Sequence, residues 1–238
     1  MTDARNRWIL AAALFALLVI VLTFPMRLAL TLAGASEAGL SARAVEGSVW
    51  SAKLVDARLG AVPLGTLGAS LSPLALIAGR TELLFERDDK RLGALAGRLH
   101  GSDPRGFSDV NGVTSLSGLG ILPVDTMRFE GATLRFDAAG KCADAGGRLQ
   151  LSVAAPIAGL DLSRGLSGPL SCAAGRAQAV LASQSGMEQL KLSFNGSGAW
   201  RAEFLIAVDN DPAMAAALAA TGFRAGKGGF RLTTTGRF

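Results

Sequence analysis

The pattern of apolar and polar residues divides the chain into a short apolar segment and a long alternating one. No charged residue occurs from Ile9 to Phe24. A helix over residues 9–26 would rise about 27 Å, close to the hydrocarbon thickness of a bilayer, with Trp8 and Phe24 where interfacial aromatic residues occur. We therefore expect one transmembrane helix, with Trp8, Ile9, Phe24 and Met26 as its boundary residues.

Positive charge predicts the orientation of this helix. Arg5 and Arg7 lie on its short N-terminal side, so the positive-inside rule places residues 1–8 in the cytoplasm and the bulk of the chain beyond the membrane. The Ala-Gly-Ala sequence at 33–35 would also suit cleavage of a secretory signal peptide. An uncleaved anchor is favoured, because the apolar run exceeds a usual signal core of about 7–15 residues and Arg27 precedes the cleavage position. Both alternatives export the remainder of the chain.

Beyond residue 40 the apolar and polar residues alternate, as in strands with one buried face. Phe204, Ile206 and Val208 fall on one side of a predicted strand, and Arg201 and Glu203 fall on the other. An alternating run precedes this strand, and the Asn195-Gly196 pair between them predicts a tight hairpin with positive φ angles. Further short runs predict strands at 48–54, 81–86, 127–129, 133–136, 148–153, 177–182 and 230–234.

Helices are predicted at only two places in this exported part. One lies between Ser72 and Gly79, and an alanine-rich one lies between Asp211 and Gly222. The stretch 101–120 is rich in Gly, Ser, Asp and Pro, and so has the composition of a connection, either between two sub-structures or within one sheet.

These elements predict a mainly β fold. Many short sequential strands favour antiparallel pairing, so we expect an elongated, curved antiparallel sheet with one or two short helices. The expected organisation is a tail over 1–8, a transmembrane helix over 9–26, a juxtamembrane linker over 27–39 with a short helix at 28–35, and an exported domain over 40–238 that could subdivide near 101–120.

Composition excludes several classes of function. With 50% hydrophobic and 18% charged residues the chain can build a packed core. The net charge of +5 comes from scattered Lys and Arg, which is unlike a nucleic-acid stripe. His100 is the only histidine, so multi-histidine zinc sites are excluded and a Ser/His/Asp triad would need this one residue, whose polar phase favours the surface.

Segments that resemble catalytic or ligand motifs are incomplete. Residues 222–228 lack the spacing and the Ser or Thr of a phosphate loop, and residues 118–123 lack the third glycine of a dinucleotide fingerprint. Residues 209–211 lack the other ligands of a calcium loop. The mixed charges at 86–91 predict a solvated turn. We therefore expect no enzyme activity, no cofactor, no metal and no small-molecule substrate.

Cys142 and Cys172 are the only cysteines, and both lie in the exported part. An oxidising compartment favours a disulfide between them, and neither Cys-x-x-Cys spacing nor other soft ligands point to redox or metal chemistry. Their bridge would close a loop of about thirty residues.

Several segments taken in order resemble a known family. The sequence Gly47-Ser48-Val49-Trp50 is similar to a glycine-x-valine-tryptophan segment, and Pro73 to Gly79 is similar to a proline-plus-leucine stretch. The segments around Cys142 and Cys172 follow in the same order. Together with the anchor, they resemble type II secretion system protein N, over nearly the whole chain.

The resemblance implies an accessory component of the bacterial secretion machinery, anchored in the inner membrane with most of the chain in the periplasm. Implied partners are other inner-membrane and periplasmic components, with the secretin as a candidate, and inner-membrane lipid. The strands at 127–136 and 230–234 are the ones we expect to offer backbone groups to a partner. The alternative is an AsmA-like groove that handles lipid between membranes. A continuous apolar groove would favour lipid, whereas an interior closed by side chains would favour a connector.

Overall fold

The computed structural model describes residues 2–36, 39–60, 62–89, 91–116, 124–153, 164–207 and 212–237. These residues form four helices: α1 (Thr2–Thr23), α2 (Met26–Leu32), α3 (Pro73–Ile77) and α4 (Pro212–Ala220). The strands are β1 (Leu40–Ser41), β2 (Ala44–Ser48), β3 (Ser51–Leu59), β4 (Val62–Leu71), β5 (Glu82–Asp89), β6 (Gly93–His100), β7 (Arg105–Ser115), β8 (Val124–Phe136), β9 (Cys142–Val153), β10 (Leu166–Ala173), β11 (Arg176–Ala182), β12 (Glu188–Phe194), β13 (Ala199–Ile206), β14 (Arg224–Gly226) and β15 (Gly229–Arg237).

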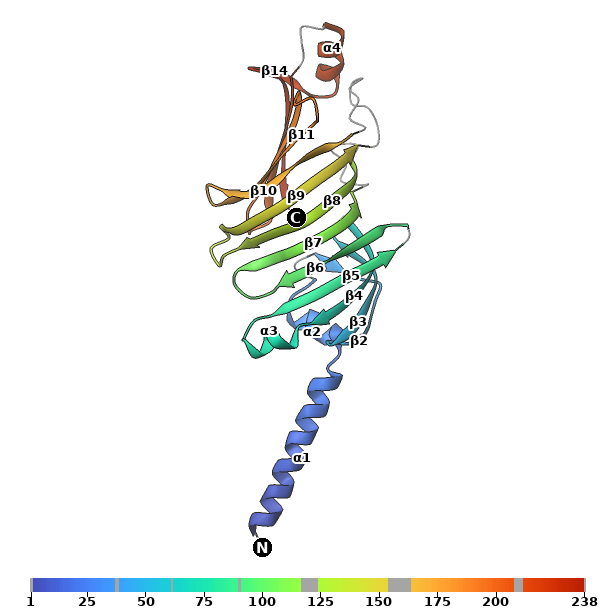
Figure 1. Cartoon of the computed structure of the whole chain (residues 1–238), viewed down its shortest axis with the longest axis vertical. Coiled ribbons are helices and arrows are strands. Elements are labelled where there is room, and N and C mark those ends of the chain that lie inside the picture. Colours follow the sequence, from blue (N-terminus) through green and yellow to red (C-terminus); the bar gives the residue numbers. More distant parts are fainter. Residues whose placement is uncertain are drawn as a thin grey trace.

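All of these strands belong to one antiparallel sheet that follows the chain almost in order. The strand order is β1-β3-β4-β5-β6-β7-β8-β9-β10-β11-β12-β13-β15-β14, and β2 pairs with β3 beside β1. In Figure 1, β5 to β9 cross the long axis of the molecule obliquely, whereas β11 and the strands after it run along that axis. The predicted fold class, a mainly β, elongated and curved antiparallel sheet, is confirmed.

The inner face of the sheet is apolar because paired residues repeat the same side-chain type. Leu181 pairs with Leu190, Leu190 with Phe204, and Phe204 with Leu232. The first three of these side chains are at most 2% exposed. Residues directly opposite on neighbouring strands have their side chains on the same face, so the pairs form a continuous apolar row. The buried phase predicted for the strand around Phe204 is confirmed.

The hairpin between β12 and β13 was predicted correctly, but its turn differs from the prediction. The connection spans residues 195–198, and Gly198 has a φ of +80°. The Asn195 side chain caps the turn, because its Oδ1 accepts a hydrogen bond from Ala199 N at 2.9 Å. Asn195 therefore acts through its side chain, and the positive φ falls on Gly198, not on the Asn195-Gly196 pair.

Three strand predictions need correction. Residues 48–54 cross the turn between β2 and β3, because Val49 and Trp50 leave the ladder after Ser48 pairs with Ser51. The predicted strands at 127–129 and 133–136 are both parts of β8, which is irregular where Gly131 has a φ of +57°. The predicted connection at 101–120 contains β7, whose eleven residues include two glycines.

Val208, Asp211 and the segments 118–123 and 209–211 lie outside the described residues.

The two predicted helices occur at α3 and α4. In α3 the Ser72 side chain accepts a hydrogen bond from Ala75 N at 3.3 Å, and Pro73 occupies the first turn. Pro73 suits that place because the first amide of a helix has no intrahelical partner. Gly79 follows with a φ of +69°, the left-handed conformation that ends many helices.

The apolar N-terminal helix is shorter at its C-terminal end than predicted. Residues Asn6–Thr23 are long and apolar enough to cross a membrane, with a mean hydropathy of 2.0 and no buried part. The helix ends at Thr23, and Pro25 separates it from α2 because proline lacks the amide hydrogen that would continue the ladder. Phe24 therefore follows the end of α1, and Met26 starts the next helix.

Candidate functional site

The turn between β2 and β3 lies against the C-terminal end of α1. Val49 N donates a hydrogen bond to Phe24 O at 2.9 Å, and the Trp50 indole Nε1 donates to Val21 O at 2.9 Å. The last carbonyls of a helix have no partner within it, and an unpaired carbonyl is costly at the edge of a membrane. Val21, Phe24, Val49 and Trp50 therefore form a hydrogen-bonded joint between helix and sheet, which we call the anchor joint.

Gly47 allows β2 and β3 to approach each other beside the anchor joint. Its φ is +93°, and a Cβ atom at this position would lie 2.3 Å from Ser51 O. A side chain would therefore strain the backbone and force the two strands apart. The family-like residues Gly47, Val49 and Trp50 have a shared structural role at this joint.

Met26 connects α2 to the interior of the sheet domain. It is 1% exposed and belongs to a cluster with Val49, Leu54 and Ala57, which are 4%, 2% and 1% exposed. Other side chains from the same end of the chain pack against this cluster, namely Phe24, Ala29 and Leu30. The short helix expected at 28–35 within the linker 27–39 occurs as α2 over Met26–Leu32, and it packs against the first strands of the sheet.

A small cavity lies between α2 and the first strands. Its volume is about 150 Å³, and its lining includes Leu30, Val45 and Leu54 together with Arg27. Sites for drug-sized ligands usually have about 300–1,000 Å³. The cavity is therefore too small to hold a phospholipid.

Helix α3 lies close to the anchor joint, and most of its side chains are exposed. Ala75 is 5% exposed, whereas Leu74 and Ile77 are 79% and 85% exposed. The family-like residue Pro73 begins this helix and Gly79 follows its C-cap, and neither carries a reactive group. Their place in the sequence predicted the helix but not its exposed apolar face.

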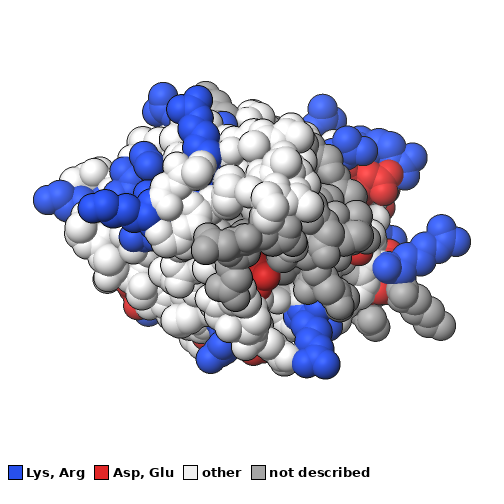
Figure 2. Space-filling view, turned by 90° about the horizontal axis from the view of Figure 1, so that it is seen from above, with Lys and Arg blue, Asp and Glu red and all other residues white. Residues whose placement is uncertain are grey.

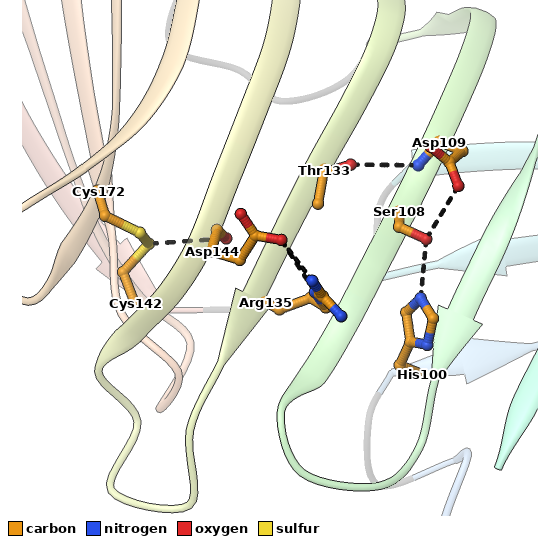
Figure 3. Close-up of polar contacts among 8 residues, drawn as sticks. All are labelled: His100, Ser108, Asp109, Thr133, Arg135, Cys142, Asp144 and Cys172. Carbon is orange, nitrogen blue, oxygen red and sulfur yellow. Dashed lines mark hydrogen bonds and ion pairs between the residues drawn. A yellow bond between two sulfur atoms is a disulfide. The ribbon is translucent and has the colours of Figure 1, made fainter. Parts of the chain in front are cut away.

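The disulfide connects the two halves of the sheet. Cys142 at the start of β9 is bonded to Cys172 near the end of β10, with their Cα atoms 5.6 Å apart. The ladder between β9 and β10 runs from the pair Leu151 and Leu166 to the pair Arg148 and Pro169. The disulfide lies beyond the end of this ladder, where it holds together strands that no longer pair (Figure 3).

A row of polar side chains crosses β6 to β9 beside the disulfide (Figure 3). His100 Nε2 lies 2.8 Å from Ser108 Oγ, and that hydroxyl donates to Asp109 Oδ2 at 3.4 Å. In a catalytic triad the imidazole lies between the hydroxyl and the carboxylate. Here the hydroxyl occupies the middle place, and Asp109 forms an ion pair with Arg98 at 3.7 Å. The arrangement is not that of an activated nucleophile.

Arg87 is a buried cation that the sequence analysis missed. It is 4% exposed and donates hydrogen bonds to four carbonyls, those of Leu64, Leu92, Gly93 and Val113. Burial lowers the pKa of its guanidinium, and the charge of Asp89 opposes that effect. The predicted solvated turn at 86–91 is therefore wrong at this residue. Its place in phase with Leu83 and Phe85 on β5 was the available signal.

Few side chains among the described residues are arranged as in a metal-binding or catalytic site. Within the described part of the chain, no three His, Cys, Asp or Glu side chains gather as metal ligands. The largest pKa perturbations fall on Arg87 and on Asp89, whose pKa is lowered by hydrogen bonds from the backbone of Leu92 and Arg91. Both residues lie near the end of β5 and contact the turn that leads to β6, so these shifts reflect structural contacts.

The features together define a class of protein: one long antiparallel sheet joined at its first strands to an apolar helix that could span a membrane. The family model for type II secretion system (T2SS), protein N matches residues 38–233, and the chain belongs to this family. It is therefore a component of the type II secretion system. No curated protein and no solved structure matches the chain.

Proposed function

We propose that this chain is an accessory component anchored in the inner membrane, whose sheet lies in the periplasm and connects other secretion components without catalysing a reaction. The main supporting observation is a single sheet that has the anchor joint near one edge and, among the described residues, a strand paired on one side alone at the other edge. Strand β14 pairs only with Gly229–Arg231 of β15. Among the described residues, Leu232–Arg237 therefore have a strand on one side alone.

The open part of β15 is the surface to which a partner strand would add. An exposed strand edge offers a row of amide and carbonyl groups, which is the basis of recognition by strand addition. The opposite edge consists of β1 and β2, which pair along β3, and β2 lies against α2 beside the anchor joint. A partner strand would have less room there than along β15. The strand at 127–136, which we also expected to be exposed, is paired on both sides and is excluded.

Positive charge near this edge indicates the chemistry of the partner. Arg224 and Lys227 are exposed at the end of the sheet that contains β14, and the exposed Arg231 beside them forms an ion pair with Glu203 at 3.0 Å. Figure 2, viewed down the long axis, shows Lys and Arg side chains projecting at several points around the rim, with acidic groups beside some of them. A partner with acidic residues beside its pairing strand would complement this charge and associate faster at low ionic strength.

The packing of α2 against the first strands supports retention of the N-terminal helix. Cleavage after residue 35 would remove Met26 and Leu30 from the cluster that contains Leu54. A cavity of that size would destabilise the domain by several kcal/mol. Arg7 before the apolar run and the disulfide after it support an N-terminus in the cytoplasm and a sheet in the periplasm.

Contacts across the curved face of the sheet favour the connector function and argue against a groove that binds lipid. Strands β4 and β7 are separated in the sheet by β5 and β6, yet Thr114 Oγ1 donates to Pro63 O at 3.3 Å. Arg87 bridges the same two strands through Leu64 and Val113. Side chains thus occupy this part of the concave face, where an acyl chain would have to lie.

Deletion of the gene tests the proposal. Export of folded periplasmic proteins should slow, while outer-membrane permeability stays unchanged, and complementation with the intact gene should restore export. Normal export with altered permeability, together with phospholipid that co-purifies in stoichiometric amount, would instead support the lipid-handling alternative.

A further inference from the structure

Helix α3 presents apolar side chains to solvent beside the membrane anchor. Leu74, Leu76 and Ile77 are 79%, 39% and 85% exposed, and only Ala75 of this helix is buried. Helix α2 likewise exposes Leu28 and Leu32 by 52% and 81%. Large apolar side chains concentrated at one end of a molecule usually mark a contact with a partner or a membrane.

A chain of backbone hydrogen bonds fixes α3 close to the end of the membrane helix. Val49 N bonds to Phe24 O at 2.9 Å, and Leu71 N bonds to Val49 O at 2.7 Å. Pro73 starts α3 two residues after Leu71, a length of chain that reaches at most about 7 Å. Figure 1 shows α3 at the end of the sheet nearest α1, level with the point where α1 enters the domain.

We propose that α3 inserts Leu74 and Ile77 into the outer leaflet of the membrane that α1 spans. This inference rests on the proposed anchoring of the chain. The lipid surface is the occupant that the anchor would bring to this helix, because the apolar span ends at Thr23 and the indole of Trp50 hydrogen-bonds Val21 O at that end. Arg27 and Arg80 are exposed next to α2 and α3, where their cations can pair with lipid phosphates.

The contact gives the sheet a defined orientation. One spanning helix leaves a domain free to tilt about the point of attachment, whereas a second contact at α3 restricts that tilt. The family-like residues Pro73 and Gly79 then have a function, since they flank the helix that touches the membrane. The open edge of β15 would consequently face its partners in a fixed direction.

The test uses the full chain in proteoliposomes with an environment-sensitive label. Cys142 and Cys172 are bonded to each other, so an Ile77→Cys variant offers one reactive thiol. Val180→Cys is the matched control, because Val180 is a 37% exposed apolar residue on β11 in the other half of the sheet. An intact-mass measurement without reductant confirms that the native disulfide is retained in both variants.

The label at position 77 should have blue-shifted emission and should be quenched several-fold more than the label at 180 by lipids that carry a quencher below the headgroup. A Leu74→Ser substitution added to Ile77→Cys should reduce this quenching. Equal quenching at both positions would overturn the inference, even if export still depends on the gene. Protection of position 77 in native envelopes but not in pure lipid would overturn it too, since a protein would then cover α3.

Discussion

At the scale of single residues, a buried guanidinium links several strands of the sheet through their carbonyl groups. Arg87 reaches β4, the β5–β6 connection and β7 at once, because its planar fork carries five donors. No carboxylate forms an ion pair with it within the described residues. The contacts of Arg87 therefore join strands that are not neighbours in the ladder.

Substitution of Arg87 should lower stability strongly. Arg87→Met leaves buried carbonyls without donors and should reduce the free energy of unfolding by on the order of 3 kcal/mol. Arg87→Lys keeps the charge but lacks the fork, so it should also destabilise. Arg91→Met is the matched control, since Arg91 is an exposed arginine in the turn that follows β5. Urea unfolding followed by circular dichroism measures the difference, and equal midpoints for the two Met variants would refute this role.

Met26 provides a residue-scale test of whether the N-terminal segment is part of the folded domain. Met26→Ala should lower the free energy of unfolding by about 2–5 kcal/mol, because it opens a cavity beside Leu54. Leu28→Ala on the exposed face of α2 should change it by less than about 0.5 kcal/mol. Thermal unfolding of the full chain in detergent compares the two, and a Met26→Ala variant as stable as Leu28→Ala would contradict the packing of α2 on the sheet.

At the scale of elements, the disulfide replaces the missing part of the β9–β10 ladder. The bridge closes a loop of 30 residues, for which the chain-entropy model gives about 3.5 kcal/mol. Replacing both Cys142 and Cys172 by Ser should therefore lower the unfolding midpoint in urea. Reduction of the unaltered protein should produce the same shift, and an unchanged midpoint would mean that the two halves of the sheet hold without the bond.

The sequence predicted elements well where the local pattern alone determines them. The capped helix at Pro73, the alternation around Phe204 and the disulfide pair all depend on residues close in the chain or on a choice of two cysteines. The turn at Val49 was missed because its partner groups lie on α1, and Arg87 was assigned to solvent because its carbonyl partners come from β4 and β7. Contacts between distant segments determined both features.

At the scale of the whole molecule, the two opposite ends of the sheet differ in structure. The first strands join the membrane helix through the anchor joint, and the last strands end in an open edge with exposed cations. The continuous sheet fixes the position of one end relative to the other, because each strand is hydrogen-bonded to the next. In the proposed function, membrane attachment would also keep the edge near other membrane-bound components at a high effective concentration.

Photo-crosslinking from the open edge tests this account most directly. A photoreactive residue replaces Thr233 on β15, and in the control it replaces Lys191 on β12, which occupies the same row and face but lies between two paired strands. After irradiation of native envelopes, mass spectrometry should identify another secretion component bound to position 233 and little product at 191. Crosslinks to phospholipid alone, or equal products at both positions, would contradict a connector that binds its partner along this edge.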